Sequence, residues 1–98
     1  MIKHVVMWKL LENAEGVNRE ENARRIKESL EGLNGKIKEI RRLVVGINSG
    51  KDQSAWDVVL ISEFDSYADL EAYANHPLHK EAGAFIQKVR DQRAVVDY

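Results

Sequence analysis

The sequence predicts an α+β domain with the element order β-α-β-β-α-β, in which helices cover one face of a four-stranded antiparallel sheet. Two observations lead to this prediction. Apolar residues alternate along extended stretches, and between these stretches they recur at the spacing of a helix. In addition, the predicted strands are apolar on both faces, so the sheet needs a cover on the side that the helices leave open.

The first half of the chain contains a strand followed by a helix. From Ile2 to Leu10 the residues divide between the two faces of a predicted strand, with Ile2, His4, Val6, Trp8 and Leu10 on one side and Lys3, Val5, Met7 and Lys9 on the other. Asn18 with Glu21 three residues later forms a capping-box pattern, and apolar residues then follow at helical spacing. We therefore predict a helix over Arg19–Leu33, which ends at Asn34-Gly35.

The second half begins with a hairpin. Two stretches rich in Val and Ile, from about Ile40 to Asn48 and from Ala55 to Phe64, are separated by the polar segment Ser49–Ser54. A third stretch, Ala94–Val96, is short and predicts the last strand of the sheet. Together with the strand over Ile2–Leu10, the two strands of the hairpin and this last strand give a sheet of four strands.

Between the hairpin and the last strand we predict a helix that is broken in two. Ser66 with Asp69 predicts a capped helix start, and this helix should stop near His76, since the residue before a proline avoids helical angles. Pro77 suits the first position of a new helix, which runs to about Asp91. The complete order is that of the ferredoxin-like, or split βαβ, fold.

The two apolar faces of this sheet predict a homodimer in which sheet packs on sheet, the arrangement of a dimeric α/β barrel. The alternative is a sheet with incidental surface valines. We assign one face to the partner subunit, made of Val5, Met7, Leu43, Val45, Val59 and Ile61. We assign the other face to the side under the helices, where it borders any pocket, made of His4, Val6, Trp8, Trp56, Val58 and Leu60.

Composition limits the possible functions. The 98 residues contain no linker-like stretch, so we expect one domain over residues 1–98. The net charge is −1 and no basic stripe is present, which argues against nucleic acid as a partner. The absence of cysteine excludes disulfides, cysteine zinc sites and thiol chemistry. No apolar run approaches membrane-spanning length, so we expect no membrane partner and a cytoplasmic location.

Four polar residues are the candidates for chemistry: His4, Tyr73, His76 and His79. The proline break brings Tyr73, at the end of one helix, close to His79, at the start of the next, and His4 shares the strand face that the helices cover. A histidine beside a small apolar cavity can act as a base at neutral pH. The alternative is that these side chains only pack in the core. His76 and His79 lack a third ligand, so we predict no metal site.

Three segments resemble the stress-responsive A/B-barrel domain family, known as Dabb. They are the opening Met1–Val6, the segment Glu71–His79 with its Tyr-x-x-His-Pro-x-His pattern, and the ending Ala94–Tyr98. The resemblance covers nearly the whole chain. It implies a ferredoxin-like fold and a homodimer joined through its sheets, in agreement with the argument from the strand pattern.

The resemblance also implies candidate roles. In one plant member, olivetolic acid cyclase, the acting His and Tyr match His79 and Tyr73, and a further pocket His matches His4. By this resemblance His79 would remove a proton from a carbon next to a carbonyl, and Tyr73 would hold His79 or the substrate's oxygen. The pocket departs from the cyclase, because Ala82 stands where that enzyme has Phe, while Gly83 leaves room near the helix start.

Three hypotheses for function follow. The first is a homodimer that binds a small, partly apolar molecule without a cofactor, as a polyketide-cyclase-like lyase with His79 and Tyr73 as catalytic residues. Its pocket would be lined by His4, Val6, Trp8, Trp56, Val58, Leu60 and Gly83. The second is a non-enzymatic, stress-linked stable dimer with a filled interior. The third, by analogy of fold alone, is a cofactor-free monooxygenase.

Overall fold

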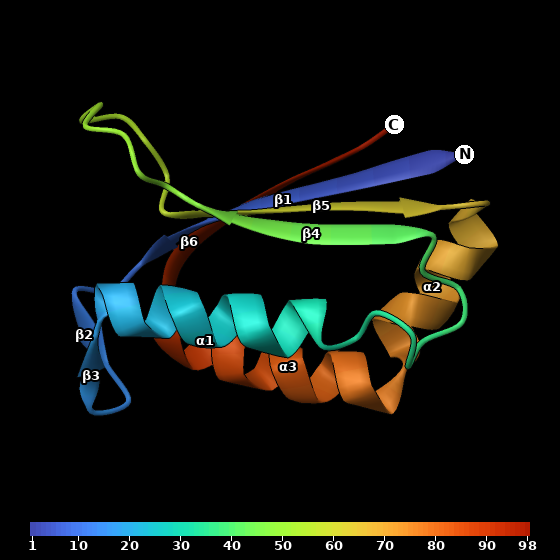
Figure 1. Cartoon of the computed structure of the whole chain (residues 1–98), viewed down its shortest axis with the longest axis horizontal. Helices are drawn as coiled ribbons and strands as arrows, with labels where there is room; N and C mark the ends of the chain where they lie inside the picture. The colour runs from blue at the N-terminus through green and yellow to red at the C-terminus, as the bar shows by residue number, and fades with distance from the viewer.

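A computed structural model describes all residues, 1–98, and confirms the ferredoxin-like fold (Figure 1). One sheet has the strand order β4-β5-β1-β6, and all its neighbouring strands are antiparallel. The elements are β1 (Ile2–Leu10), β2 (Asn13–Ala14), β3 (Val17–Asn18), α1 (Arg19–Glu31), β4 (Arg42–Ile47), β5 (Val58–Phe64), α2 (Tyr67–Asn75), α3 (Pro77–Val89) and β6 (Arg90–Asp97).

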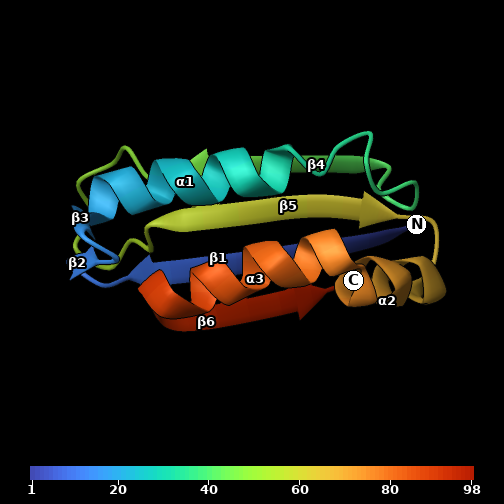
Figure 2. The same cartoon turned by 90° about the horizontal axis from the view of Figure 1, so that it is seen from below.

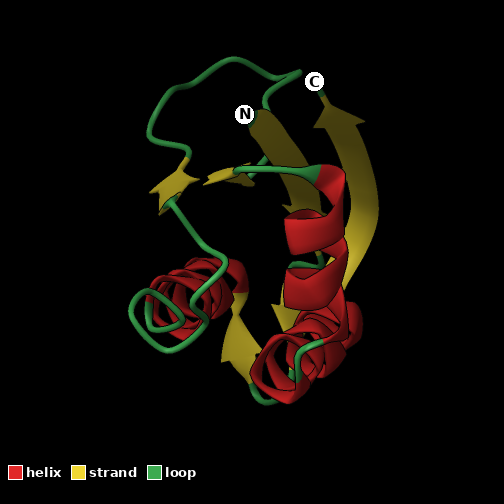
Figure 3. Cartoon of the chain, turned by 90° about the vertical axis from the view of Figure 1, so that its right-hand side faces the viewer, coloured by secondary structure: helices red, strands yellow, loops and turns green.

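The three helices lie on one face of the sheet, as Figures 2 and 3 show. In Figure 2, α1 runs along the β4 and β5 side and α3 along the β1 and β6 side, while α2 lies at one end. Seventeen buried apolar residues fill the space between the helices and this inner face of the sheet. The outer face carries no helix. None of the helices is long and apolar enough to cross a bilayer.

The helix starts follow the predicted caps. The side chain of Asn18 accepts a hydrogen bond from the backbone N–H of Glu21 at the start of α1. Ser66 accepts from the N–H of Asp69 at the start of α2. At the break, Pro77 is the first residue of α3, and the side chain of His76 accepts from the N–H of Leu78. These caps satisfy backbone N–H groups that a helix start leaves unpaired.

Several element bounds differ from the sequence prediction. The last strand, β6, has eight residues from Arg90 to Asp97, because it pairs along almost the whole of β1. The helices α1 and α3 end two residues earlier than predicted, at Glu31 and Val89. The two-residue strands β2 and β3 form a small hairpin that we did not predict; its turn has Gly16 at a φ of 80°.

The assignment of Leu43 and Val45 to the partner face is wrong. Both side chains are buried under the helices, with 3% exposed. The register explains this, because Val45 pairs with Leu60, an inner-face residue of β5, and directly opposed residues point to the same side. The outward-pointing residues of β4 are therefore Val44 and Gly46, which lie opposite Ile61 and Val59.

The corrected outer face is still apolar. It is formed by the residues of all four strands that alternate with the buried ones, namely Val5, Met7, Val44, Val59, Ile61, Ala94 and Val96. None of these seven belongs to the buried core, and Val96 exposes 61% of its surface. The sheet thus has one face covered by the chain's own helices and one apolar face without a cover.

Candidate functional site

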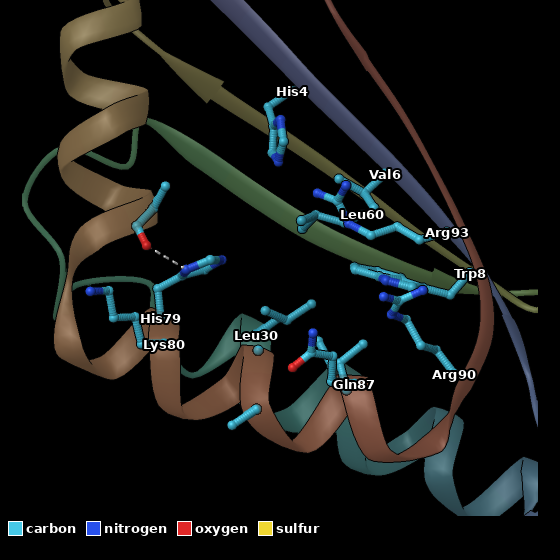
Figure 4. A pocket seen from close by; sticks show the side chains of 14 residues that line it. His4, Val6, Trp8, Leu30, Leu60, His79, Lys80, Gln87, Arg90 and Arg93 are labelled. Atoms are coloured by element: carbon cyan, nitrogen blue, oxygen red, sulfur yellow. Dashed lines mark hydrogen bonds between the residues drawn. The ribbon is translucent and has the colours of Figure 1, made fainter.

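A cavity of about 480 Å³ lies between α3 and the inner face of the sheet at β1 and β6 (Figure 4). Six of the predicted site residues line it: His4, Val6, Trp8, Leu60, His79 and Gly83. Its other lining residues are Leu30, Ala74, Lys80, Ala84, Ile86, Gln87, Arg90 and Arg93. A volume of this size is typical of sites for small molecules.

His79 is held by the break between α2 and α3. The last carbonyl groups of a helix have no partner within it, and the carbonyl of Ala74 in the last turn of α2 is one of them. Nδ1 of His79, in the first turn of α3, lies 3.1 Å from this oxygen. Because a carbonyl only accepts, Nδ1 carries the proton and Nε2 of the neutral ring keeps its lone pair. Figure 4 shows this second nitrogen turned toward the cavity.

Burial lowers the pKa of His79 from its usual 6.5. The hydrogen bond with Ala74 opposes this shift, while electrostatic interactions with His4, Arg93 and His76 add to it. The lowered pKa keeps the ring neutral at pH 7. His79 therefore has the protonation state of a general base.

Tyr73 packs against His79 but does not hold it by a hydrogen bond. The centroids of the Tyr73 and His79 rings are 4.4 Å apart, with an angle of 49° between the planes. The ring of Phe64 also packs on that of Tyr73, at a centroid distance of 5.0 Å. The Tyr73 side chain is 1% exposed and its hydroxyl has no hydrogen-bond partner in the chain. Burial raises the pKa of Tyr73, so the phenol keeps its proton.

Tyr73 lines a second hollow rather than the main cavity. This hollow has a volume of about 390 Å³ and shares His4, Ala74, His79 and Arg93 with the main cavity. The two spaces thus meet at the histidines. Tyr73 lines this hollow, and its buried hydroxyl has no hydrogen-bond partner within the chain.

His4 is oriented by a carboxylate that we did not predict from the sequence. Its Nδ1 lies 2.5 Å from Oδ1 of Asp97, across the β1–β6 pair in which His4 and Asp97 are opposite residues. An ionised carboxylate only accepts, so the shared proton is on Nδ1 and Nε2 is left for another contact. Figure 4 shows the His4 side chain extending from β1 toward the cavity.

The structure places Trp56 and Val58 away from the cavity. Strand β5 starts only at Val58, so the alternation of the strand does not extend back to Trp56. Trp56 instead lines a hollow with Met7 and Ile47, and the amine of Lys9 lies 5.3 Å from its ring. Val58 is a core residue, 2% exposed. No group of three or more His, Cys, Asp or Glu side chains is arranged to hold a metal ion.

Three cationic residues at the cavity were missed: Lys80, Arg90 and Arg93. Arg90 and Arg93 belong to β6, which we predicted to begin only at Ala94. Had the strand been extended backward, the alternation from Asp97 through Val95 would have placed Arg93 on the same face as His4. The signal was therefore present in the sequence but lay outside the predicted strand.

Comparison with known proteins identifies the family. The model of the stress responsive A/B barrel domain (Dabb) matches residues 2–98. The chain belongs to this Dabb family. A crystal structure of a dimeric protein of unknown function with a ferredoxin-like fold from Bacteroides fragilis is 38% identical, with a TM-score of 0.84, and the match covers 99% of this chain and 93% of that one.

Two further solved structures share the fold at lower identity. A dimeric ferredoxin-like protein of unknown function from Thermobifida fusca is 22% identical, with a TM-score of 0.84 and coverage of 99% and 88%. Hydroxynitrile lyase from Passiflora edulis is 17% identical, with a TM-score of 0.80 and coverage of 99% and 90%. Among curated protein sequences none matches the chain.

Proposed function

We propose that this Dabb protein is a cofactor-independent lyase of the polyketide-cyclase type that acts on a small, partly apolar carbonyl compound. His79 is the general base. The observation that carries the proposal is the hydrogen bond from His79 Nδ1 to the Ala74 carbonyl, which directs the lone pair of Nε2 into a cavity of about 480 Å³. A lowered pKa and a defined tautomer are both needed for a base that works at neutral pH.

In the proposed reaction, Nε2 of His79 takes a proton from a carbon next to a substrate carbonyl. The resulting enolate carbon attacks a second carbonyl carbon of the same molecule, so that a carbon–carbon bond forms and the attacked oxygen becomes an alkoxide. That alkoxide takes the proton back from the His79 imidazolium, which restores the base. The Tyr73 hydroxyl, which has no partner in the chain, is the donor for a substrate oxygen, while the His4 Nε2 can accept a hydrogen bond from a substrate hydroxyl.

The cavity favours this proposal over a non-enzymatic dimer, for which we expected a filled interior. The apolar walls of the cavity include Val6, Leu30 and Leu60, which are core residues only 1–2% exposed, so the space is bordered by packed side chains. The fold also accommodates lyase chemistry, since the protein from Passiflora edulis with a TM-score of 0.80 is a hydroxynitrile lyase.

We further propose that the protein is a homodimer joined through the outer face of the sheet. The seven apolar residues of that face have no cover within the chain, and a two-fold axis lets the same patch on two copies cover itself. The similar proteins from Bacteroides fragilis and Thermobifida fusca are dimeric. The cavity lies on the opposite side of the sheet, so dimerisation leaves its mouth open.

Proton abstraction can be tested without knowing the natural substrate. Benzylacetone is a partly apolar ketone whose protons next to the carbonyl exchange slowly in heavy water. Proton NMR of this ketone with the protein should show faster loss of these signals than without it. Replacement of the base in His79→Ala should remove the acceleration, by at least about 100-fold.

His76→Asn is the matched control, because His76 caps α3 outside the cavity and Asn is an equally good cap. It should exchange the protons at close to the wild-type rate, because His76 is the smallest of the influences on the pKa of His79. Equal exchange rates for wild type and His79→Ala would refute His79 as the base. Cyclisation of linear polyketide thioesters, followed by mass spectrometry, then identifies the substrate.

A further inference from the structure

The charge around the cavity is of one sign. Among its fourteen lining residues, Lys80, Arg90 and Arg93 are cationic and none is Asp or Glu. All three lie on α3 or on β6, and the neighbouring walls are formed by apolar side chains, Val6 and Trp8 on the adjacent strand β1 and Leu30 on α1. The cavity therefore has an apolar part and a basic part.

The two arginines have no anionic partner in the chain. Neither Arg90 nor Arg93 takes part in a salt bridge, although six ion pairs form elsewhere and engage four other arginines. The carboxylate of Asp97, which borders the second hollow beside Arg93, is bound to His4. Figure 4 shows both arginine side chains extending from β6 along the sheet side of the cavity, Arg90 beside Trp8 and Arg93 beside Val6.

An unpaired guanidinium next to a cavity is suited to a planar or tetrahedral oxyanion, which it can bind through two parallel hydrogen bonds. Two of them on one strand, three residues apart and beside the apolar side chains of β1, would bind the acidic end of a molecule whose apolar part lies against Trp8. Since Arg93 also borders the hollow that contains Tyr73 and His79, the acidic group would fix the distance of the reacting carbon from the base.

We infer that the ligand of this cavity is an acidic molecule, with a carboxylate or phosphate group held by Arg90 and Arg93 and an apolar segment against Val6, Trp8 and Leu30. This inference rests on the proposed function for the location of the site, and it adds the chemical class of the substrate. Lys80, at the start of α3, supplies further positive charge at the mouth.

A pair of probe molecules tests the inference. Phenylbutyrate and its neutral amide, phenylbutyramide, have the same apolar segment and differ only in charge. Trp8 lines the cavity and Trp56 does not, so the indole N–H signals of the two tryptophans report binding at the site and elsewhere. In titrations at neutral pH, phenylbutyrate should shift the Trp8 signal and bind at least about tenfold more tightly than the amide.

Arg90→Gln and Arg93→Gln should each weaken phenylbutyrate binding by about 10- to 100-fold and leave amide binding unchanged. Lys88→Gln, which removes the same charge from the exposed side of α3 outside the cavity, is the matched control and should bind as wild type. Phenylpropyl phosphate distinguishes the two oxyanions: tighter binding than phenylbutyrate assigns the site to phosphate, and weaker binding assigns it to carboxylate.

Equal affinity for acid and amide, wild-type binding by both arginine variants, or no shift of Trp8 with either probe would overturn the inference. Its outcome is separable from that of the proposed function. His79→Ala should still bind phenylbutyrate, so binding that depends on the arginines, without His79-dependent proton exchange, would remove only the catalytic role. Exchange that depends on His79 but not on the arginines would remove only the acidic ligand.

Discussion

The ring of Tyr73 packs on the ring of His79 at a centroid distance of 4.4 Å, and the Tyr73 hydroxyl makes no hydrogen bond within the chain. The contact between the two residues is thus one of ring packing. It positions the imidazole from one side, while the Ala74 carbonyl fixes its rotation through Nδ1. The hydroxyl has no partner within the chain, so the ring packing of Tyr73 can be tested separately from its proposed role as a donor to the substrate.

Tyr73→Phe tests this separation. The substitution keeps the ring and removes a buried, unpaired hydroxyl, so the free energy of unfolding should stay the same or rise by about 1 kcal/mol. Chemical denaturation followed by circular dichroism measures it. If the hydroxyl contacts a substrate oxygen, the rate of proton exchange should fall by about tenfold or more in the same variant. A marked loss of stability would instead mean that the hydroxyl is hydrogen-bonded in the folded protein.

The pKa of His79 predicts the pH dependence of stability. Burial lowers this pKa in the folded state, so between the folded pKa and about 6.5 the unfolded chain binds more protons than the folded one. Stability should therefore fall as the pH drops from 6.5 through the folded pKa, and His79 should add no further change above 6.5. NMR titration of the imidazole carbon-bound protons measures the folded pKa directly.

A matched variant checks the origin of this effect. His79→Gln has no titratable group at this position, so its stability should decline less steeply than that of wild type over the same pH range. The positive charge of Arg93 also lowers the pKa of His79, and Arg93→Gln should consequently raise it. A His79 pKa at or above 6.5 in the wild-type protein would contradict both expectations.

The parts of the fold that sequence predicted well depend on neighbours along the chain. Asn18, Ser66 and Pro77 start helices through contacts within three residues, so their patterns are visible locally. The same is true of the alternation along β1, which placed His4, Val6 and Trp8 on the inner face and beside the cavity.

The errors arose where distant pairing decides the outcome. Leu43 and Val45 alternate correctly within β4, but which of the two faces they occupy is set by the register with β5, and a shift of one residue reverses it. Arg90 fell in the predicted helix and Arg93 in the predicted loop after it, whereas both belong to β6, which is extended by its pairing with β1. Trp56 precedes β5, whose start depends on the hairpin rather than on local composition.

The proposed dimer interface predicts different effects for the same substitution on opposite faces of the sheet. Val59 lies on the outer face in the central strand β5, between Met7 and Gly46. Val59→Asp should place a charge in the centre of the interface and convert the dimer to a monomer. Val95→Asp is the control, because Val95 pairs with the inner-face residue Val6 and is already 44% exposed.

Sedimentation velocity measures the oligomeric state of both valine variants, and circular dichroism shows whether each is folded. We expect a folded monomer or a strongly weakened dimer for Val59→Asp and a wild-type dimer for Val95→Asp. A wild-type protein that sediments as a monomer at all concentrations, or a Val59→Asp dimer as tight as wild type, would rule out the outer face as the interface.

Gly83 offers a way to fill the cavity from the helix side. It lies within α3 and lines the cavity, and a Cβ added there would meet no atom within 4 Å. Gly83→Ala should therefore raise the free energy of unfolding by about 0.5–1 kcal/mol, through the higher helix propensity of Ala, without blocking the site. Calorimetric unfolding measures this effect, and a destabilised Gly83→Ala would contradict the open space at Gly83.

Gly83→Phe should instead occupy the space next to His79 and abolish both phenylbutyrate binding and proton exchange. The Trp8 titration measures the binding, and a Gly83→Phe protein that binds the probe like wild type would show that the ligand does not lie against Gly83.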